Sequence, residues 1–137
     1  MQKAINTIHL YLHYIDSFHL DQSNAEKFAY LFEEGASFSF PHRGLLKTGR
    51  AEFKSLCEAM GSRFKGFNHL EYNIVLEEAG DGVVKNMSYW SSWDQDMMTA
   101  IGKHYDTLAL QEDGKWLFRE RLVTVTWTRE EGNIVDL

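Results

Sequence analysis

The chain has little of several residue types that mark particular classes of protein. Its 137 residues include one cysteine, Cys57, and one proline, Pro41. A single thiol excludes an internal disulfide and any cysteine-based metal cluster. Cys57 lies at helical spacing with Phe53, Leu56 and Met60, so we expect it in the core of a helix rather than as a nucleophile.

Long apolar runs and basic blocks are missing as well. No apolar run approaches the length of a membrane span, and no basic-then-apolar leader begins the chain. The net charge is −6, which argues against nucleic-acid binding because phosphate neutralisation requires clustered basic side chains. We therefore expect a cytoplasmic protein with neither a membrane nor a nucleic acid as partner.

Large hydrophobic side chains are plentiful, by contrast. The hydrophobic share is 44% and the aromatic share 14%. A chain of this length is expected to form one domain, residues 1–137, with an ordered core from about residue 3 to 129. Such a domain buries roughly two thirds of its unfolded surface and needs no metal or disulfide to be stable.

Three segments in the first half of the chain carry apolar residues at helical spacing. In the first segment, Ile5, Ile8, Leu12 and Ile15 recur about one turn apart. The second begins with a capping box and ends before Gly35. The predicted helices are residues 2–20, 24–34 and 50–63.

The second half of the chain is rich in β-branched and aromatic residues that alternate with polar ones. The pair Asp113-Gly114 between two such runs is the strongest short-range signal for a β-hairpin. Helices first and strands last predict an α+β fold, in which a curled antiparallel sheet encloses a pocket that the helices cover. The predicted strands are residues 36–40, 67–77, 82–93, 97–111 and 116–128.

Four local patterns, in this order, carry a resemblance to a known family. The patterns are Tyr11-x4-Asp16 with Asp21; Leu31 to Phe38 (LFEEGASF) with Gly49-Arg50-Ala51; His69 to Asn73 (HLEYN); and Gly102-x3-Asp106 with Asp113-Gly114-Lys115-Trp116 and Arg121. They resemble the SnoaL-like group of the nuclear transport factor 2-like superfamily, which includes scytalone dehydratase, bile-acid dehydratases, polyketide cyclases and ketosteroid isomerases. The resemblance implies a cone-shaped α+β barrel, with three N-terminal helices packed on a curled, mostly antiparallel sheet.

The resemblance also implies site residues. The dehydratase-like members use a tyrosine and an aspartate from the first helix and a histidine from the strand after the third helix. The matching positions here are Tyr11, Asp16 and His69. Ketosteroid isomerases instead place an aspartate base directly before a proline in the first strand. Phe40 precedes Pro41 here, so that base is missing.

Each of these three residues has a structural alternative to its catalytic role. His69, which shares a strand face with Glu71 and Asn73, is a general acid or base, or else a strand-end histidine bonded to a neighbour. Asp16, placed unfavourably near a helix C-terminus, either orients His69 or faces solvent. Tyr11 either polarises a carbonyl or completes the core edge.

Alternation along the strand of residues 97–111 places His104 and Asp106 on one face, pointing into the predicted cavity. We expect these two side chains either to contact a ligand, or to form a buried ion pair or lie exposed at a strand edge. His9 and His13 have a zinc-ligand spacing, but no third ligand is in register, so neither a metal site nor a cofactor is expected. The predicted pocket or ligand-binding residues are His104, Asp106, Asn73, Phe40, Trp90 and Leu108.

Two hypotheses of different class remain. The first is a cofactor-free dehydratase, isomerase or cyclase that acts on a small hydrophobic, ring-containing molecule, with His69 moving the proton. The second is a non-catalytic module that binds a small ligand or only dimerises. In either case we expect a homodimer through the sheet, because strands such as 122–127 are apolar on both faces and the helices cover only one.

Overall fold

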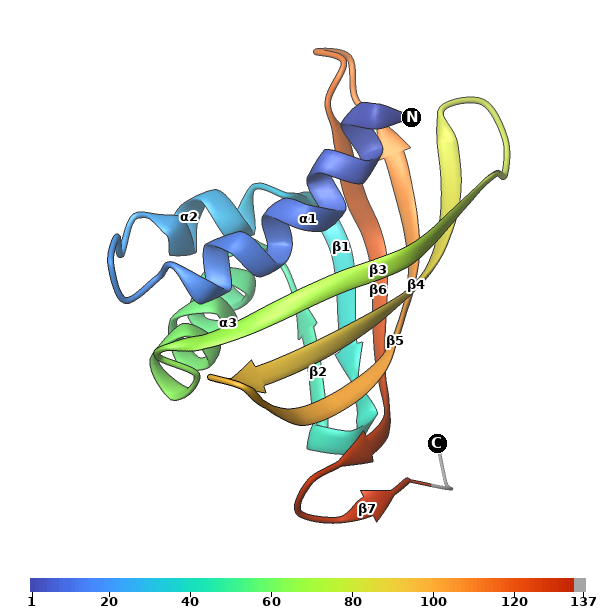
Figure 1. The fold of residues 1–137 in the computed structure, drawn as a ribbon. Coiled ribbons are helices and arrows are strands. Elements are labelled where there is room, and N and C mark those ends of the chain that lie inside the picture. Colours follow the sequence, from blue (N-terminus) through green and yellow to red (C-terminus); the bar gives the residue numbers. More distant parts are fainter. Residues whose placement is uncertain (135–137) are drawn as a thin grey trace.

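The computed structural model describes residues 1–134 and packs three helices against one curved sheet (Figure 1). The helices are α1 Gln2–Asp16, α2 Asn24–Ala29 and α3 Arg50–Arg63, with a 3₁₀ turn, η1, at Pro41–Arg43. The strands are β1 Phe32–Phe40, β2 Leu45–Thr48, β3 Phe67–Glu78, β4 Val83–Asp94, β5 Met97–Leu110, β6 Trp116–Thr128 and β7 Gly132–Asn133.

The sheet has the strand order β2-β1-β6-β5-β4-β3, with β7 paired to β6. Neighbouring strands are antiparallel except for β1 and β6, which run parallel. Strands β2 and β3 form its two edges, and within residues 1–134 no pairing joins them, so the sheet curls without closing. The predicted α+β fold with a curled, mostly antiparallel sheet is confirmed.

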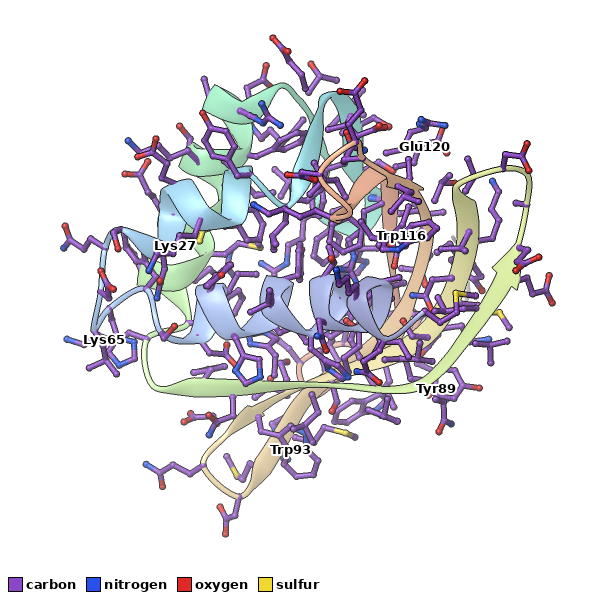
Figure 2. The ribbon with its side chains drawn as sticks, turned by 90° about the horizontal axis from the view of Figure 1, so that it is seen from above. Lys27, Lys65, Tyr89, Trp93, Trp116 and Glu120 are labelled. Atoms are coloured by element: carbon purple, nitrogen blue, oxygen red, sulfur yellow. The ribbon has the colours of Figure 1, made fainter. Side chains whose placement is uncertain are left out.

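Strand length and bulges explain the curl. Strands β3 to β6 are 12 to 14 residues long, and each pairing among them contains a register shift. Long strands accumulate twist, and every bulge adds a local bend. As a result α1 lies between β3 on one side and β1 and β6 on the other, as the two perpendicular views show (Figures 1 and 2).

The space between α1 and the sheet is filled by side chains, and many of them are aromatic (Figure 2). Phe28, Phe32 and Phe118 are fully buried. The Phe32 and Phe53 rings stack with centroids 4.2 Å apart, and Tyr11 lies 5.0 Å from Phe28. Burying each such side chain contributes about 1.5–3 kcal/mol, so the chain needs no further cross-link to hold α1 in place.

The first two helices are shorter than predicted. Helix α1 ends at Asp16: the Ser17 amide makes the last i→i−4 bond, to the His13 carbonyl, and the amides of Phe18 and Leu20 then bond three residues back, which turns the chain. Helix α2 ends at Ala29, and β1 begins at Phe32, four residues before the predicted strand. The apolar spacing of Phe28, Ala29 and Phe32 runs on across this boundary, but Phe32 pairs with Phe118 of β6. The prediction that 24–34 is a helix is therefore wrong at its end.

Two short strands were not predicted. Strand β2 has four residues and lies in a segment expected to be a link, while β7 pairs Asn133 with Trp127 beyond the expected ordered core. Strands of this length are too short to show alternation. No helix within residues 1–134 is long and apolar enough to cross a bilayer.

Gly102 allows the closest approach of β5 to β6, and this generates a test of the packing. A Cβ atom at this position would lie 1.9 Å from the Thr124 carbonyl oxygen and 2.8 Å from Trp90 Nε1. The indole donates to that same carbonyl at 3.0 Å, so neither group can move aside freely in a packed interior. We expect Gly102→Ala to lower the free energy of unfolding by about 1–3 kcal/mol in urea denaturation.

Gly35→Ala is the matched control. A Cβ atom at Gly35 would meet nothing within 4 Å, and the residue is exposed. Its replacement should leave stability unchanged or raise it slightly, since alanine restricts the unfolded chain. Equal losses in the two variants would contradict the account of β5–β6 packing.

Candidate functional site

Asp16, the last residue of α1, holds His69 at the start of β3. Its Oδ1 accepts the imidazole Nδ1–H at 2.6 Å, and its Oδ2 accepts the His69 backbone N–H at 2.7 Å. Because β3 is an edge strand, that backbone donor has no strand partner on its outer side. One carboxylate therefore anchors the strand and fixes the imidazole.

These two bonds explain why an aspartate is tolerated at the end of a helix. The unfavourable interaction with the helix dipole costs about 0.3–1 kcal/mol. Each hydrogen bond to a charged group contributes about 1.5–3 kcal/mol, so the bonds outweigh the dipole. The side chains of His69 and Asp16 are only 10% and 18% exposed. With Nδ1 bound to the carboxylate, Nε2 is the nitrogen left for a molecule in the cavity.

The His69 ring lines an inner chamber of about 50 Å³ between α1, α3 and the sheet. Tyr11 and His104 line the same chamber, with aromatic walls from Phe64 and Trp90. Phe64 meets His69 edge to face, with centroids 5.6 Å apart, and Trp90 stacks on His104 at 6.0 Å. Two imidazoles and a phenol thus face one small, largely apolar space.

Tyr11 keeps its hydroxyl proton. Burial raises the pKa of its phenol above the ordinary value, although the nearby Arg121 guanidinium acts in the opposite direction. That guanidinium lies over the Tyr11 ring, 4.1 Å from its centroid. A neutral phenol at the wall of a dry chamber is a hydrogen-bond donor for a carbonyl oxygen.

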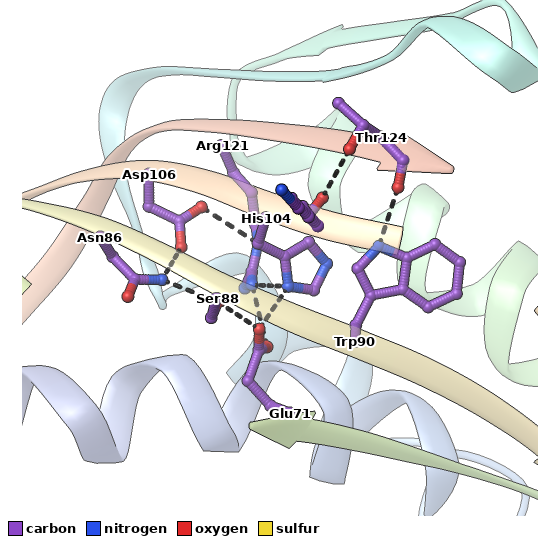
Figure 3. Close-up of polar contacts among 9 residues, drawn as sticks. Glu71, Asn86, Ser88, Trp90, His104, Asp106, Arg121 and Thr124 are labelled. Carbon is purple, nitrogen blue, oxygen red and sulfur yellow. Dashed lines mark hydrogen bonds and ion pairs between the residues drawn. The ribbon is translucent and has the colours of Figure 1, made fainter. Parts of the chain in front are cut away.

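Behind this chamber lies a buried polar network centred on Arg121 of β6 (Figure 3). Its guanidinium donates to Glu71 at 3.0 Å, and its Nε lies 3.2 Å from an Asp106 oxygen. The side chains of Arg121 and Glu71 are fully buried. Strand β3 is separated from β6 by two other strands. This ion pair therefore joins two strands that are not neighbours and stabilises the inward curvature of the β3 edge.

His104 joins the same network from β5. Its Nδ1 lies 2.6 Å from Glu71 Oε2, so a hydrogen must lie between the two atoms. Arg121 also contacts this ring nitrogen. Burial, together with the Arg121 charge, lowers the pKa of His104 to about 4. The ring is therefore neutral near pH 7, with its Nδ1–H bonded to Glu71.

The two carboxylates of the network behave differently. Burial alone would raise the pKa of Glu71, but the charges and hydrogen bonds of His104 and Arg121, with a 2.6 Å bond from Ser88, lower it to about 2. Since His104 is neutral, we assign most of this effect to Arg121. Burial raises the pKa of Asp106 to about 7, despite the guanidinium and a 2.8 Å bond from Asn86. Glu71 is thus the permanent counter-charge of Arg121.

The structure brings most of the predicted residues together. Phe40 and Trp90 line the inner chamber with Tyr11 and the two histidines. Asp106 lies behind His104 in the network, which matches the alternative of a buried ion pair rather than a ligand contact. Leu108 is fully buried in the core and does not line the chamber.

The prediction that Asn73 shares the inward face of His69 is wrong. Asn73 is exposed and has a positive φ of 54°. The β3–β4 register shifts between Tyr72 and Val75, so the alternation reverses there and Ile74 turns inward instead. A bulge of this kind leaves no signal in simple alternation.

Two central residues were not among the predicted site residues. Glu71 was visible as the neighbour of His69 on one strand face, and Arg121 as the last residue of the fourth family pattern. Cys57 is buried, and burial raises the pKa of its thiol to about 12, which makes it unreactive. Among residues 1–134, no three histidine, cysteine or acidic side chains gather closely enough to hold a metal ion.

The neutral, buried His104 makes stability depend on pH in a direction that can be worked out. The folded pKa of about 4 lies below the ordinary value of 6.5, so stability that depends on the neutral ring is complete above pH 6.5 and is lost as the pH falls toward 4. Asp106 acts oppositely, because its raised pKa lets the folded protein take up a proton first. A variant comparison is therefore needed to isolate the histidine.

Between pH 7 and pH 5, the free energy of unfolding of the wild type should fall relative to that of His104→Gln. The expected difference is about 1–2 kcal/mol, measured by urea denaturation at each pH. Val123→Ala, opposite His104 on β6, introduces no titrating group and should cost the same at both pH values. A constant difference between wild type and His104→Gln would contradict a neutral buried ring.

Comparisons with known proteins agree with the fold described above. A candidate scytalone dehydratase from Novosphingobium aromaticivorans shares 25% identity and a TM-score of 0.72, over 99% of this chain and 93% of that one. ActVI-ORFA from Streptomyces coelicolor has 18% identity and a TM-score of 0.69, over 90% of this chain and 95% of that one. An NTF-2 like protein of unknown function from Pseudomonas aeruginosa has 15% identity and a TM-score of 0.75, over 90% of this chain and 98% of that one. The likeness to these last two structures shows the fold alone.

The comparison with curated proteins found no significant match. The family model described as a SnoaL-like domain matches residues 3–122, which is most of the chain and includes all the residues of the buried network. The resemblance expected from the four local patterns is thereby confirmed, and the chain belongs to the SnoaL-like domain family.

Proposed function

We propose that the protein is a cofactor-free dehydratase, isomerase or cyclase that acts on a small hydrophobic molecule bearing a ring and a carbonyl. The observation that carries this proposal is the pairing of His69 with Asp16 at a chamber that Tyr11 also lines. The candidate scytalone dehydratase among the similar structures supports the same reaction class. A module that only binds its ligand has no need of an oriented imidazole facing a protonated phenol.

The proposed reaction begins with proton abstraction from a carbon beside the carbonyl. His69 Nε2 takes the proton, the electron pair of the C–H bond moves toward the carbonyl oxygen, and the Tyr11 hydroxyl donates to that oxygen. Asp16 stabilises the resulting imidazolium. The imidazolium then returns the proton, either to a departing β-hydroxyl group, which leaves as water, or to another carbon of the substrate, which completes an isomerisation.

We assign the base to His69 rather than to His104 on electrostatic grounds. The Asp16 carboxylate bonded to His69 can stabilise an imidazolium that forms during the reaction, whereas burial and the Arg121 guanidinium beside His104 oppose protonation of that ring. His104 instead serves as a neutral polar contact for the substrate through its Nε2. The small volume supports the chemistry as well, since about 50 Å³ admits only about three waters.

Turnover of a panel of cyclic β-hydroxyketones tests this assignment. His69→Ala should lower kcat about 10²- to 10⁴-fold, because that is the usual contribution of a positioned acid or base. Asp16→Asn should lower it less, since the ring keeps one orienting acceptor. His104→Gln should retain most of the turnover. Exchange of the α-proton in D₂O, followed by NMR, reads out the first step directly.

His13→Gln is the control, because it removes an exposed imidazole from the same helix as Asp16. Circular dichroism melting of every variant separates lost chemistry from lost folding. A loss of turnover in His104→Gln, with none in His69→Ala, would place the base on β5. Ligand binding without exchange or turnover in the wild type would favour the non-catalytic alternative.

We further propose a homodimer through the outer face of the sheet. Val75, Met87 and Tyr105 are 49%, 46% and 39% exposed, and they are neighbours in register across β3, β4 and β5. Figure 2 places Tyr89 on the side of β3 that faces away from α1, and its ring contacts Tyr72 at 5.8 Å. Covering an apolar face of this kind contributes roughly 25 cal/mol per Å² of area removed from water.

A charge in the centre of this face should separate the subunits. We expect wild type to have the mass of a dimer in light scattering at micromolar concentration and Met87→Glu to have that of a monomer, because a buried carboxylate without a partner is costly. Leu20→Glu, at a residue 79% exposed beside the helices, should leave the dimer intact. A monomeric wild type would rule out this surface as a subunit interface.

A further inference from the structure

The inner chamber adjoins a larger outer chamber of about 630 Å³. Phe40, Phe64, Trp90 and Arg43 line both spaces, so the two share a wall of aromatic and basic side chains. A volume of this size suits a whole small-molecule ligand, whereas the inner chamber takes only the reactive end of one. The side chains of the outer chamber therefore select the remainder of the molecule.

Three arginines face this outer chamber: Arg43 at the end of η1, Arg63 at the end of α3 and Arg129 after β6. Within the described part of the chain, none of the three has a carboxylate oxygen within 4 Å. Arg119 and Arg121, by contrast, each pair with a glutamate. All three residues are exposed, so their guanidiniums are accessible to an anion that enters the outer chamber.

Aromatic rings hold two of these guanidiniums close together. Arg43 lies 5.4 Å and Arg63 5.5 Å from the centroid of the same ring, that of Phe64. Arg43 also lies 5.6 Å from the ring of Phe40. Burial is the main cause that lowers the pKa of Arg43, and repulsion from the Arg63 charge lowers it further, while the Glu131 carboxylate acts in the opposite direction. An anion between the two groups would relieve that repulsion and add bidentate hydrogen bonds.

The charge of the rim limits which anion fits. Glu130 and Glu131 also line the outer chamber, and the Glu131 carboxylate is bonded to His42 at 2.9 Å. Three guanidiniums against two carboxylates leave one net positive charge among the arginines and glutamates of this chamber. One positive charge matches a carboxylate better than a doubly charged phosphate, which the two glutamates would repel.

We infer that the ligand is a ring-bearing carboxylic acid whose carboxylate is held by Arg43 and Arg63 at the mouth of the cavity. The ring then lies against Phe64 and Trp90, and the opposite end reaches the inner chamber at His69. This inference rests on the proposed function for the identity of the reactive end. The anion site itself depends only on the outer chamber.

Binding of 2-naphthoate and of its neutral methyl ester, measured by calorimetry or by tryptophan fluorescence, tests the inference. The wild type should bind the acid at least about tenfold more tightly than the ester, and added salt should reduce only the affinity for the acid. Arg43→Gln and Arg63→Gln should each weaken acid binding about tenfold and leave ester binding unchanged. Arg63→Lys should restore part of the affinity.

Lys65→Gln is the matched control, because it removes the same charge next to Phe64 without lining either chamber. It should bind the acid as the wild type does. His69→Ala should keep the preference for the acid over the ester, whatever its affinity for either, and should lose turnover of the cyclic β-hydroxyketones, so a failure of the proton-transfer proposal would be distinct from a failure of the anion site.

Three results would overturn the inference. Equal affinity for acid and ester would show that the carboxylate is not recognised. Binding of neither probe at millimolar concentration would show that the chamber does not take a ring-bearing anion. Displacement of naphthoate by inorganic phosphate at comparable concentration would assign the arginines to a phosphate-bearing ligand instead of a carboxylic acid.

Discussion

The buried Arg121–Glu71 ion pair is the interaction on which the arrangement of the cavity depends. It joins β6 to β3, two strands that are not neighbours in the sheet, and so holds the sheet in its curled form. Removing one partner of a buried pair typically costs about 3–5 kcal/mol, because the other charge remains without compensation. The same guanidinium lies over Tyr11 and against His104, and its charge adds to the effect of burial in keeping His104 neutral. One charge thus links the shape of the sheet to the chemistry of its cavity.

The two histidines of the cavity acquire different roles from their surroundings. Each has Nδ1 bonded to a carboxylate, at the same distance of 2.6 Å. His104, however, shares its carboxylate with a guanidinium and is completely enclosed, while His69 has Asp16 to itself near the rim. The first therefore stays neutral, and the second can carry a proton during a reaction. The distance from Nδ1 to the carboxylate is the same for both rings, so it is the neighbouring charges that make His104 a polar contact and His69 a base.

The sequence predicts the parts of this structure that depend on local pattern. The three helices, the four long strands and the pair Asp16–His69 all follow from spacing or from motifs that the family shares. Boundaries fail where tertiary pairing overrides the local pattern, as at Phe32, which pairs with Phe118 in β1 although its spacing is helical. The prediction that Asn73 faces inward fails because a bulge in β3 reverses the alternation of inward and outward side chains. Arg43 and Arg63 escape prediction altogether, since only the folded chain brings the ends of η1 and α3 together around Phe64.

The central claim is that a carbonyl-bearing ring binds with its reactive carbon at His69 and its oxygen at Tyr11. A crystal structure of the protein with a bound cyclic ketone tests this most directly. We predict the ketone oxygen within about 2.6–3.2 Å of the Tyr11 hydroxyl, and the adjacent carbon within about 3–3.5 Å of His69 Nε2. A ketone seated at the outer face of the sheet, or one whose carbonyl points away from both residues, would contradict the account.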